Sequence, residues 1–287
     1  MSGPELSWPS LTLALAGLRL RLHCSDPALL QGLRARCAGF LAPEEPGTPD
    51  ARLRVQVSGE GAASGCEAAR LDFPGGGLRW EAPGCRGELA PGAREGALTL
   101  HSARPLQDCD AFLRLACALL AERAGGLLFH AAGVVRQGRA YLFFGPSGSG
   151  KTTAARLSRG CRVLNDDLLV LLPCGAGWEA HATPFWNPSQ VRPAPGCAPA
   201  AGLYRLVQDR RVYLENPGPG LALAELLACV PVLPLDPARA PALLDRCRRL
   251  LESLPARRLH FLPDASFWEC LLREEARAAG GPHPDTG

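Results

Sequence analysis

The stretch GPSGSGKTT, from Gly145 to Thr153, contains Lys151, the only lysine in a chain of 287 residues whose other basic residues are all arginine. Its first eight residues fit the pattern G-x-x-x-x-G-K-[ST] at every fixed position. The stretch follows the apolar run AYLFF (140–144) and precedes a segment that we expect to be helical. A strand, a glycine-rich loop and a helix in that order predict a phosphate-binding loop (P-loop) in an α/β fold.

The residue types of this loop suit a phosphate group. Glycines let the backbone turn so that successive N–H groups face inward, and the following helix adds a partial positive charge. Lys151 offers a compact ammonium, whereas the broader, planar guanidinium of arginine would crowd a closed loop. Thr152 can give its hydroxyl to Mg²⁺. The alternative is a glycine-rich turn that only resembles the motif. We expect a nucleotide to be bound by Gly145, Pro146, Ser147, Gly148, Ser149, Gly150, Lys151, Thr152 and Thr153.

Two acids and a histidine flank the loop in the sequence. Asp166 and Asp167 interrupt the otherwise apolar segment RVLNDDLLVLL (162–172), where Mg²⁺ could find hard oxygen ligands. Neighbouring residues of a strand point to opposite faces, so one acid can support the metal while the other meets the substrate. The alternative is a polar turn between two strands. His130, in LLFHAAGVV, lies one short hairpin before the loop, although a lone histidine is often a structural core residue.

The first part of the chain, residues 1–103, has the pattern of a small α+β unit. LRLRLHC (18–24) alternates like a half-buried strand, and Asp26-Pro27 offers a cap for a helix through residues 28–41. Glycine- and proline-rich turns separate further strand-like runs and predict a mostly antiparallel sheet. These runs are 51–57, 69–73, 78–82 and 97–102.

Residues 104–275 are expected to form the P-loop domain, and residues 276–287 a disordered tail. The pattern predicts a helix over 106–123, strands at 127–135, 140–144 and 162–172, a loop at 194–202, a capped amphipathic helix at 236–254, and a last strand and helix at 257–264 and 266–278.

Composition narrows the class of protein. A net charge of +3 with acids and bases intermixed provides no polybasic face, so we expect neither nucleic acid nor membrane as a partner. Twelve cysteines without CxxC spacing suggest reduced core thiols of a cytoplasmic protein, and no histidine cluster indicates a zinc site. The N-terminal residues have no basic leader, and the apolar run 221–235 contains Glu225 and is too short for a bilayer.

At the histidine, the P-loop and the acid pair, the chain resembles the HPr kinase/phosphorylase family, which shares a core with phosphoenolpyruvate carboxykinases. The family has the same three elements in the same order. The resemblance covers residues 125–175 firmly, and 182–190 and 257–272 more loosely. It implies a P-loop kinase core of the HPr kinase C-terminal type after the small α+β unit. It also implies that Lys151 binds the transferred phosphate and that Asp167 accepts the proton of a substrate hydroxyl.

The same resemblance implies ATP and Mg²⁺ as cofactors, with Thr152 and Asp166 at the metal, and a catalytic group formed by Asp167, Asp166, His130 and Lys151. A further glycine-rich signature of HPr kinases is missing from residues 173–197, so we do not expect phosphorylase activity or HPr itself as substrate. The chain is similar to shorter HPr-kinase-like proteins of peptide-modification systems, including lasso-peptide tailoring kinases. This implies transfer to a serine or threonine hydroxyl of a peptide or protein, with Phe185, Trp186 and Arg192 on a substrate-facing loop.

Alternatives stay open at this point. A small-molecule alcohol could be the acceptor, both aromatic residues of that loop could simply pack in the core, and the nucleotide could be ATP or GTP. The chain could also be a P-loop NTPase or a nucleotide-binding switch or scaffold that transfers no phosphoryl group to a substrate. The sequence leaves a homo-oligomer equally open, and shared architecture alone does not assign chemistry.

Overall fold

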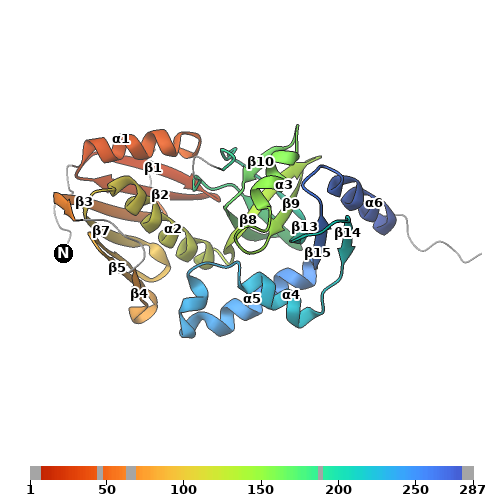
Figure 1. The fold of residues 1–287 in the computed structure, drawn as a ribbon. Helices are drawn as coiled ribbons and strands as arrows, with labels where there is room; N and C mark the ends of the chain where they lie inside the picture. Colours follow the sequence, from red (N-terminus) through yellow and green to blue (C-terminus); the bar gives the residue numbers. More distant parts are fainter. Residues whose placement is uncertain (1–7, 44–47, 63–68, 187–189, 280–287) are drawn as a thin grey trace, which may run out of the picture.

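The computed structural model describes residues 8–43, 48–62, 69–186 and 190–279. Over these ranges the chain is a mixed α/β structure with a seven-stranded and an eight-stranded sheet (Figure 1). Within the same ranges, eleven cysteines are free thiols and seven of these are buried. None of the described helices has the length and apolar character needed to cross a bilayer.

The first sheet is built from the N-terminal part of the chain, with strand order β1-β2-β3-β7-β6-β5-β4. Four of its six pairings are antiparallel, while β2–β3 and β3–β7 are parallel. The strands are β1 (Ser10–Leu15), β2 (Leu18–Cys24), β3 (Ala51–Ala62), β4 (Arg70–Asp72), β5 (Leu78–Ala82), β6 (Cys85–Leu89) and β7 (Glu95–Ser102).

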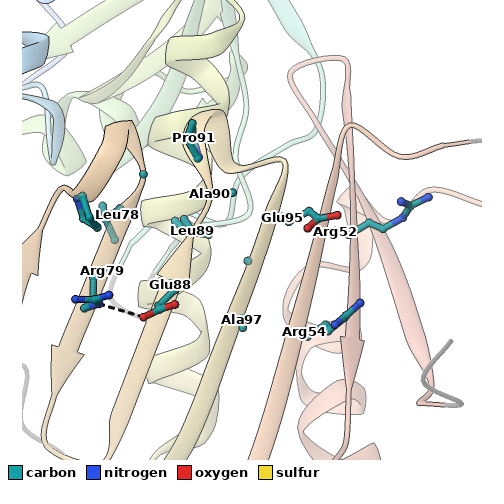
Figure 2. A pocket seen from close by; sticks show the side chains of 13 residues that line it. Arg52, Arg54, Leu78, Arg79, Glu88, Leu89, Ala90, Pro91, Glu95 and Ala97 are labelled. Atoms are coloured by element: carbon teal, nitrogen blue, oxygen red, sulfur yellow. Dashed lines mark hydrogen bonds and ion pairs between the residues drawn. The ribbon is translucent and has the colours of Figure 1, made fainter. Parts of the chain in front are cut away.

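Two helices in contact with each other pack on this sheet, α1 (Pro27–Arg36) on β1 and β2 and α2 (Pro105–Arg123) on β6 and β7. Asp26 caps α1 by accepting hydrogen bonds from the N–H groups of Ala28 and Leu29. The other face of the sheet is open and charged, with a hollow of about 400 Å³ near Arg52, Arg54 and the Arg79–Glu88 ion pair (Figure 2). This hollow lies away from the P-loop.

The second sheet follows the order β10-β8-β11-β12-β13-β15-β14, and β9 pairs with both β8 and β13. Its pairings are antiparallel except β9–β13 and β13–β15. The strands are β8 (Leu127–Arg136), β9 (Arg139–Phe144), β10 (Arg162–Asn165), β11 (Leu168–Cys174), β12 (Gly177–His181), β13 (Cys197–Gln208), β14 (Tyr213–Glu215) and β15 (Ala256–Phe261).

Four further helices surround this sheet (Figure 1). They are α3 (Lys151–Leu157), α4 (Pro219–Leu227), α5 (Ala240–Ser253) and α6 (Phe267–Ala279). Short 3₁₀ turns occur at η1 (Ala38–Phe40), η3 (Pro74–Gly76), η4 (Pro91–Ala93), η5 (Leu233–Leu235) and η6 (Pro237–Arg239). α6 is fixed to the end of α3 because the indole of Trp268 donates a hydrogen bond to the Ser158 hydroxyl.

Helix α2 joins the two sheets into one apolar core. Its buried face includes Phe112 and Leu113, and one continuous cluster of buried side chains runs from Leu22 in the first sheet to Leu171 in the second. The boundary that we expect near residue 103 therefore falls at the start of a helix that packs on both units.

Most of the elements expected from the sequence are confirmed, with four corrections. The strand expected at 162–172 is interrupted by a bend at Asp166 and Asp167 and forms β10 and β11. The helix after Asp26 ends at Arg36 instead of near residue 41, because a 3₁₀ turn follows it. The expectation of a loop at 194–202 is wrong from Cys197 onward, where β13 forms despite its small residues because it pairs with β12 and β9. Residues 276–279, expected in the tail, continue α6, and residues 280–287 lie outside the described ranges.

Substitution of Gly126, which lies between α2 and β8, tests how closely this connection is packed against β11. A Cβ at Gly126 would lie 2.1 Å from the Leu171 carbonyl oxygen, which is backbone and cannot move away as a side chain could. We expect Gly126→Ala to lower the free energy of unfolding by about 3 kcal/mol, the upper end of overpacking effects. Urea unfolding measures this. Gly220→Ala is the control, because nothing lies within 4 Å of its Cβ position, and an equal loss in both variants would contradict the prediction.

Candidate functional site

The P-loop runs from the end of β9 to the start of α3. Gly145, Gly148 and Gly150 have φ angles of 144°, 76° and 104°, a region that side-chain-bearing residues rarely occupy. A Cβ at Gly150 would also lie 2.6 Å from the Phe261 ring. The glycines of the motif are therefore required by the backbone path of the loop.

Lys151 is folded back onto this loop. Its side chain is 7% exposed, and Nζ donates hydrogen bonds to the carbonyl oxygens of Gly145 (2.8 Å) and Pro146 (3.1 Å). Burial lowers the pKa of Lys151, and the guanidinium of Arg205 lowers it further, while the Asp166 and Asp167 carboxylates oppose this. The ammonium is thus held where an anion entering the loop would replace carbonyl oxygens as its partner.

Strand β8 brings the P-loop and the acid pair together. Residues 127–130 of β8 pair with β11, and residues 131–136 pair with β9. His130 therefore lies opposite Leu168, directly after the acid pair, and Ala131 lies opposite Phe144, directly before the P-loop. Phe144 and Leu168 are more than twenty residues apart in the sequence, yet they lie opposite two consecutive residues of β8.

The acid pair lies in a bend between β10 and β11, and Asn165 shapes this bend. Asn165 is fully buried, and its Oδ1 accepts hydrogen bonds from the N–H groups of Asp167 (2.7 Å) and Leu168 (3.2 Å). Its Nδ2 donates to the carbonyl oxygens of Thr183 and Phe185, both at 2.9 Å. The alternative of a polar turn between two strands thus describes the backbone correctly, and this turn directs the two carboxylates to different partners.

Asp166 lies in a position suited to a cation. The side chain is 1% exposed, Oδ2 accepts a hydrogen bond from the Val191 N–H (3.2 Å), and the buried Oδ1 has no hydrogen-bond partner among the described residues. Burial raises the pKa of Asp166, while the N–H of Val191 and the hydroxyl of Thr152 lower it. A buried, under-compensated carboxylate beside a threonine hydroxyl is a set of hard oxygen donors that fits Mg²⁺.

Asp167 has two different partners. Its Oδ2 accepts from Arg114 Nη1 at 2.9 Å, and its Oδ1 lies 3.3 Å from His130 Nε2. Burial lowers the pKa of His130, the Lys151 charge lowers it further, and the Asp167 charge opposes both. The structure therefore places His130 against Asp167, with the imidazole held toward its neutral form.

A chain of charges connects Asp167 to the N-terminal sheet unit. Arg114 Nε, on α2, lies 3.0 Å from Asp110 Oδ2, and Asp110 Oδ1 accepts from Arg36 Nε of α1 at 2.7 Å. Arg36 also donates to the Trp186 carbonyl oxygen at 2.6 Å. The side chains of Arg36, Asp110, Arg114 and Asp167 are all at least three-quarters buried, so each charge depends on its neighbours for compensation.

A pocket of about 280 Å³ opens beside the P-loop. It is lined by several of the residues expected at the site, among them His130, Lys151, Thr152 and Asp166, together with Gln190 and Gln208. Among the described residues, Asp167 does not line this pocket, but its Oδ1 lies 3.3 Å from Nε2 of His130, which does. The predicted site residues are thus gathered in one place, with Asp167 at its edge.

The segment expected to face a substrate has a mixed outcome. Phe185 is fully buried, with the Arg114 guanidinium 5.3 Å from its ring centre, so it packs in the core. Trp186 is half-buried and Arg192 is exposed. Residues 187–189 lie outside the described ranges. This segment therefore meets the site through Gln190 and Val191 instead of through its aromatic side chains.

Sequence reasoning missed Arg114, Asp110 and Asn165. The role of Asn165 could have been found in the sequence, because an asparagine before two polar residues often accepts hydrogen bonds from the backbone that follows it. The helical spacing of Asp110 and Arg114 indicated only an ion pair within α2. Nothing local shows that Arg114 spans 53 residues of sequence to Asp167.

Replacement of Arg114 tests whether the charge chain is structural. Arg114→Leu leaves Asp110 and Asp167 without their shared cation, so we expect the free energy of unfolding to fall by about 3 kcal/mol, the lower end of the range for buried pairs that lose one partner. The control Arg248→Leu removes two mostly exposed ion pairs, to Asp245 and Glu252, and should change stability by less than about 0.5 kcal/mol. Denaturant titration of both variants measures the free energy of unfolding. Comparable small losses in both would show that the chain of charges contributes little to stability.

Comparison with known proteins gives one local similarity. A family model described as "SynChlorMet cassette protein ScmC" matches residues 111–192, which is 82 of the 287 residues. No curated protein matches the chain. The matched segment begins within α2 and contains Arg114, His130, the P-loop and both aspartates, so it coincides with the candidate site while leaving the N-terminal sheet outside.

Proposed function

We propose that this chain is a Mg-ATP-dependent kinase with a P-loop core of the HPr-kinase-like type, which transfers the γ-phosphoryl group to a serine or threonine hydroxyl of a protein or peptide. The observation that carries the proposal is the convergence of three elements at one pocket. These are the P-loop with Lys151, the Thr152–Asp166 oxygen donors, and the Asp167–His130 pair. Phosphoryl transfer requires mainly positioning, charge stabilisation and one oriented base, and these residue types provide all three.

In the proposed reaction, the P-loop would bind the phosphates of the nucleotide. The Lys151 ammonium would exchange its two carbonyl partners for phosphate oxygens, and backbone N–H groups of the loop would surround the remaining charge. Thr152 and Asp166 would hold Mg²⁺, which supplies charge neutralisation of the transferred group and leaving ADP. Within the described parts of the chain, Oδ1 of Asp166 has no hydrogen-bond partner, and this supports the assignment.

The acceptor side belongs to Asp167. Because Oδ2 is occupied by Arg114, Oδ1 is the oxygen that would take the proton as the hydroxyl O–H bond breaks and its oxygen bonds to phosphorus. Arg114 orients the carboxylate without reaching the pocket, so it is a positioning residue. His130, with its lowered pKa, can share the proton with Asp167 or align the hydroxyl.

Asp167→Asn tests the role of the base. We expect this variant to lose phosphoryl transfer by about 10²–10⁴-fold, the usual contribution of a general base, while its affinity for ATP stays within a few-fold. The assay supplies γ-labelled ATP and Mg²⁺ with a peptide or lysate derived from the genes next to its own. Asp245→Asn, which changes a half-buried acid on α5, is the matched control. Full transfer by Asp167→Asn would contradict the assigned role.

The same assay separates the kinase from a nucleotide hydrolase. Label on an acceptor hydroxyl supports the kinase, and its loss in Asp167→Asn assigns the base. Release of free phosphate alone, at a rate unaffected by every acceptor offered, would replace the proposal with a P-loop NTPase or switch.

Lys151→Arg tests why this position keeps the only lysine. Lys151 is 7% exposed and its Nζ fits between two carbonyl oxygens of the loop, so a guanidinium has no room there although it carries the same charge. We expect ATP affinity measured by calorimetry to fall at least about tenfold, which corresponds to 1.4 kcal/mol. Wild-type affinity in Lys151→Arg would show that only the charge matters.

A further inference from the structure

Three metal-binding side chains gather on one face of β12 and β13, outside the P-loop pocket. They are Glu179, His181 and Cys197, and their ligand atoms all lie within 4.8 Å of one another. His181 Nε2 is 3.0 Å from Glu179 Oε2. The strand register explains the cluster, because His181 pairs directly with Cys197 and Glu179 lies two residues before His181, on the same face.

The donor types and spacings suit a zinc-class cation. Zn²⁺ binds imidazole nitrogen, thiolate sulfur and carboxylate oxygen at about 2.0–2.3 Å, so its donors lie about 3.3–3.6 Å apart in a tetrahedral site. His181 Nε2 and Glu179 Oε2 are 3.0 Å apart and all three donor atoms lie within 4.8 Å of one another, so rotation of side chains on neighbouring strands can bring them to this separation. Hard cations such as Mg²⁺ prefer oxygen ligands and fit the Thr152–Asp166 group instead.

We infer that Glu179, His181 and Cys197 form a binding site for Zn²⁺ or a similar divalent transition metal, with water at the fourth position. Cys197 is exposed while His181 is only 14% exposed, so a metal can enter from solvent and still be partly enclosed. Metal binding would displace the thiol proton of Cys197.

The proposed metal site lies at the two ends of the segment 182–196, which reaches the P-loop pocket. His181 directly precedes this segment, Cys197 directly follows it, and the Ala182 N–H donates to the Gly196 carbonyl oxygen at 2.9 Å. Between these ends, Val191 donates to Asp166 and Gln190 lines the pocket. A metal bound to both ends would fix the base of this segment, and this placement holds whether or not the proposed kinase activity is correct.

The sequence alone did not predict this cluster of Glu179, His181 and Cys197. His181 and Cys197 are sixteen residues apart, and Glu179 and His181 alone make a pattern common on exposed strands. The absence of CxxC spacing argued against a zinc site, but that spacing describes ligands from one turn. Here the ligands come from two paired strands, which only the register reveals.

Cobalt titration tests the inference. The full chain, reduced and stripped of metal with a chelator, is titrated with Co²⁺, and a thiolate-to-cobalt charge-transfer band together with strong tetrahedral d–d bands should saturate at one equivalent. Zn²⁺ should then abolish both. Co²⁺ bound at Thr152 and Asp166 gives no thiolate band, so Asp166→Asn should leave the signal unchanged.

Variants assign the ligands. Cys197→Ser should remove the charge-transfer band, and His181→Gln should weaken Co²⁺ binding more than about 100-fold, since loss of even an outer partner costs 10–100-fold. Cys174→Ser is the matched control, an exposed thiol at the end of β11 that lies outside the cluster, and should keep the band. Melting without metal shows whether each variant is folded. The absence of a thiolate band in the wild type, or its survival in folded Cys197→Ser, would overturn the inference.

Discussion

The register of β8 is the constraint on which the candidate site depends. This strand pairs with β11 up to His130 and with β9 from Ala131, so the end of one pairing is the beginning of the other. One pairing fixes the acid pair and the other fixes the P-loop. A slip of one residue would turn His130 to the opposite face and separate it from Asp167. The apolar residues of β8, buried on both sides, hold the register because any slip would expose them or bury Arg136.

The N-terminal unit takes part in the site through charge. Arg36 of α1 and Arg114 of α2 alternate with Asp110 and Asp167, so two cations and two carboxylates balance in a largely buried row. A buried charge that loses its partner is strongly destabilising, and for this reason the row acts as a unit. The carboxylate of Asp167 is thus oriented from a helix that packs on the first sheet. The two units cannot move apart without disturbing either the shared apolar core or this row.

The sequence predicts what depends on neighbours in the chain. The P-loop, the cap at Asp26 and the strand β2 follow from spacing and residue type over a few positions. The sequence does not predict features that depend on how distant strands pair. The first half of β13, CAPAAG (197–202), is rich in alanine, proline and glycine, which indicate a loop. Its central place between β9, β12 and β15 nevertheless makes it a strand. Likewise, the Arg114–Asp167 contact joins two elements whose relative placement no local pattern contains.

The two neighbouring aspartates differ because of the bend at Asn165. A regular strand would have sent them to opposite faces of the sheet, whereas the bend keeps both near β8 and gives each its own surroundings. Asp166 lies against Thr152 and the Val191 N–H, and its Oδ1 has no partner among the residues that the structure describes. Burial raises its pKa, and a cation would lower it again. Asp167 already has Arg114 as its counter-charge. In the proposed reaction, Asp166 would hold a cation while Oδ1 of Asp167, which lies beside His130, would accept a proton.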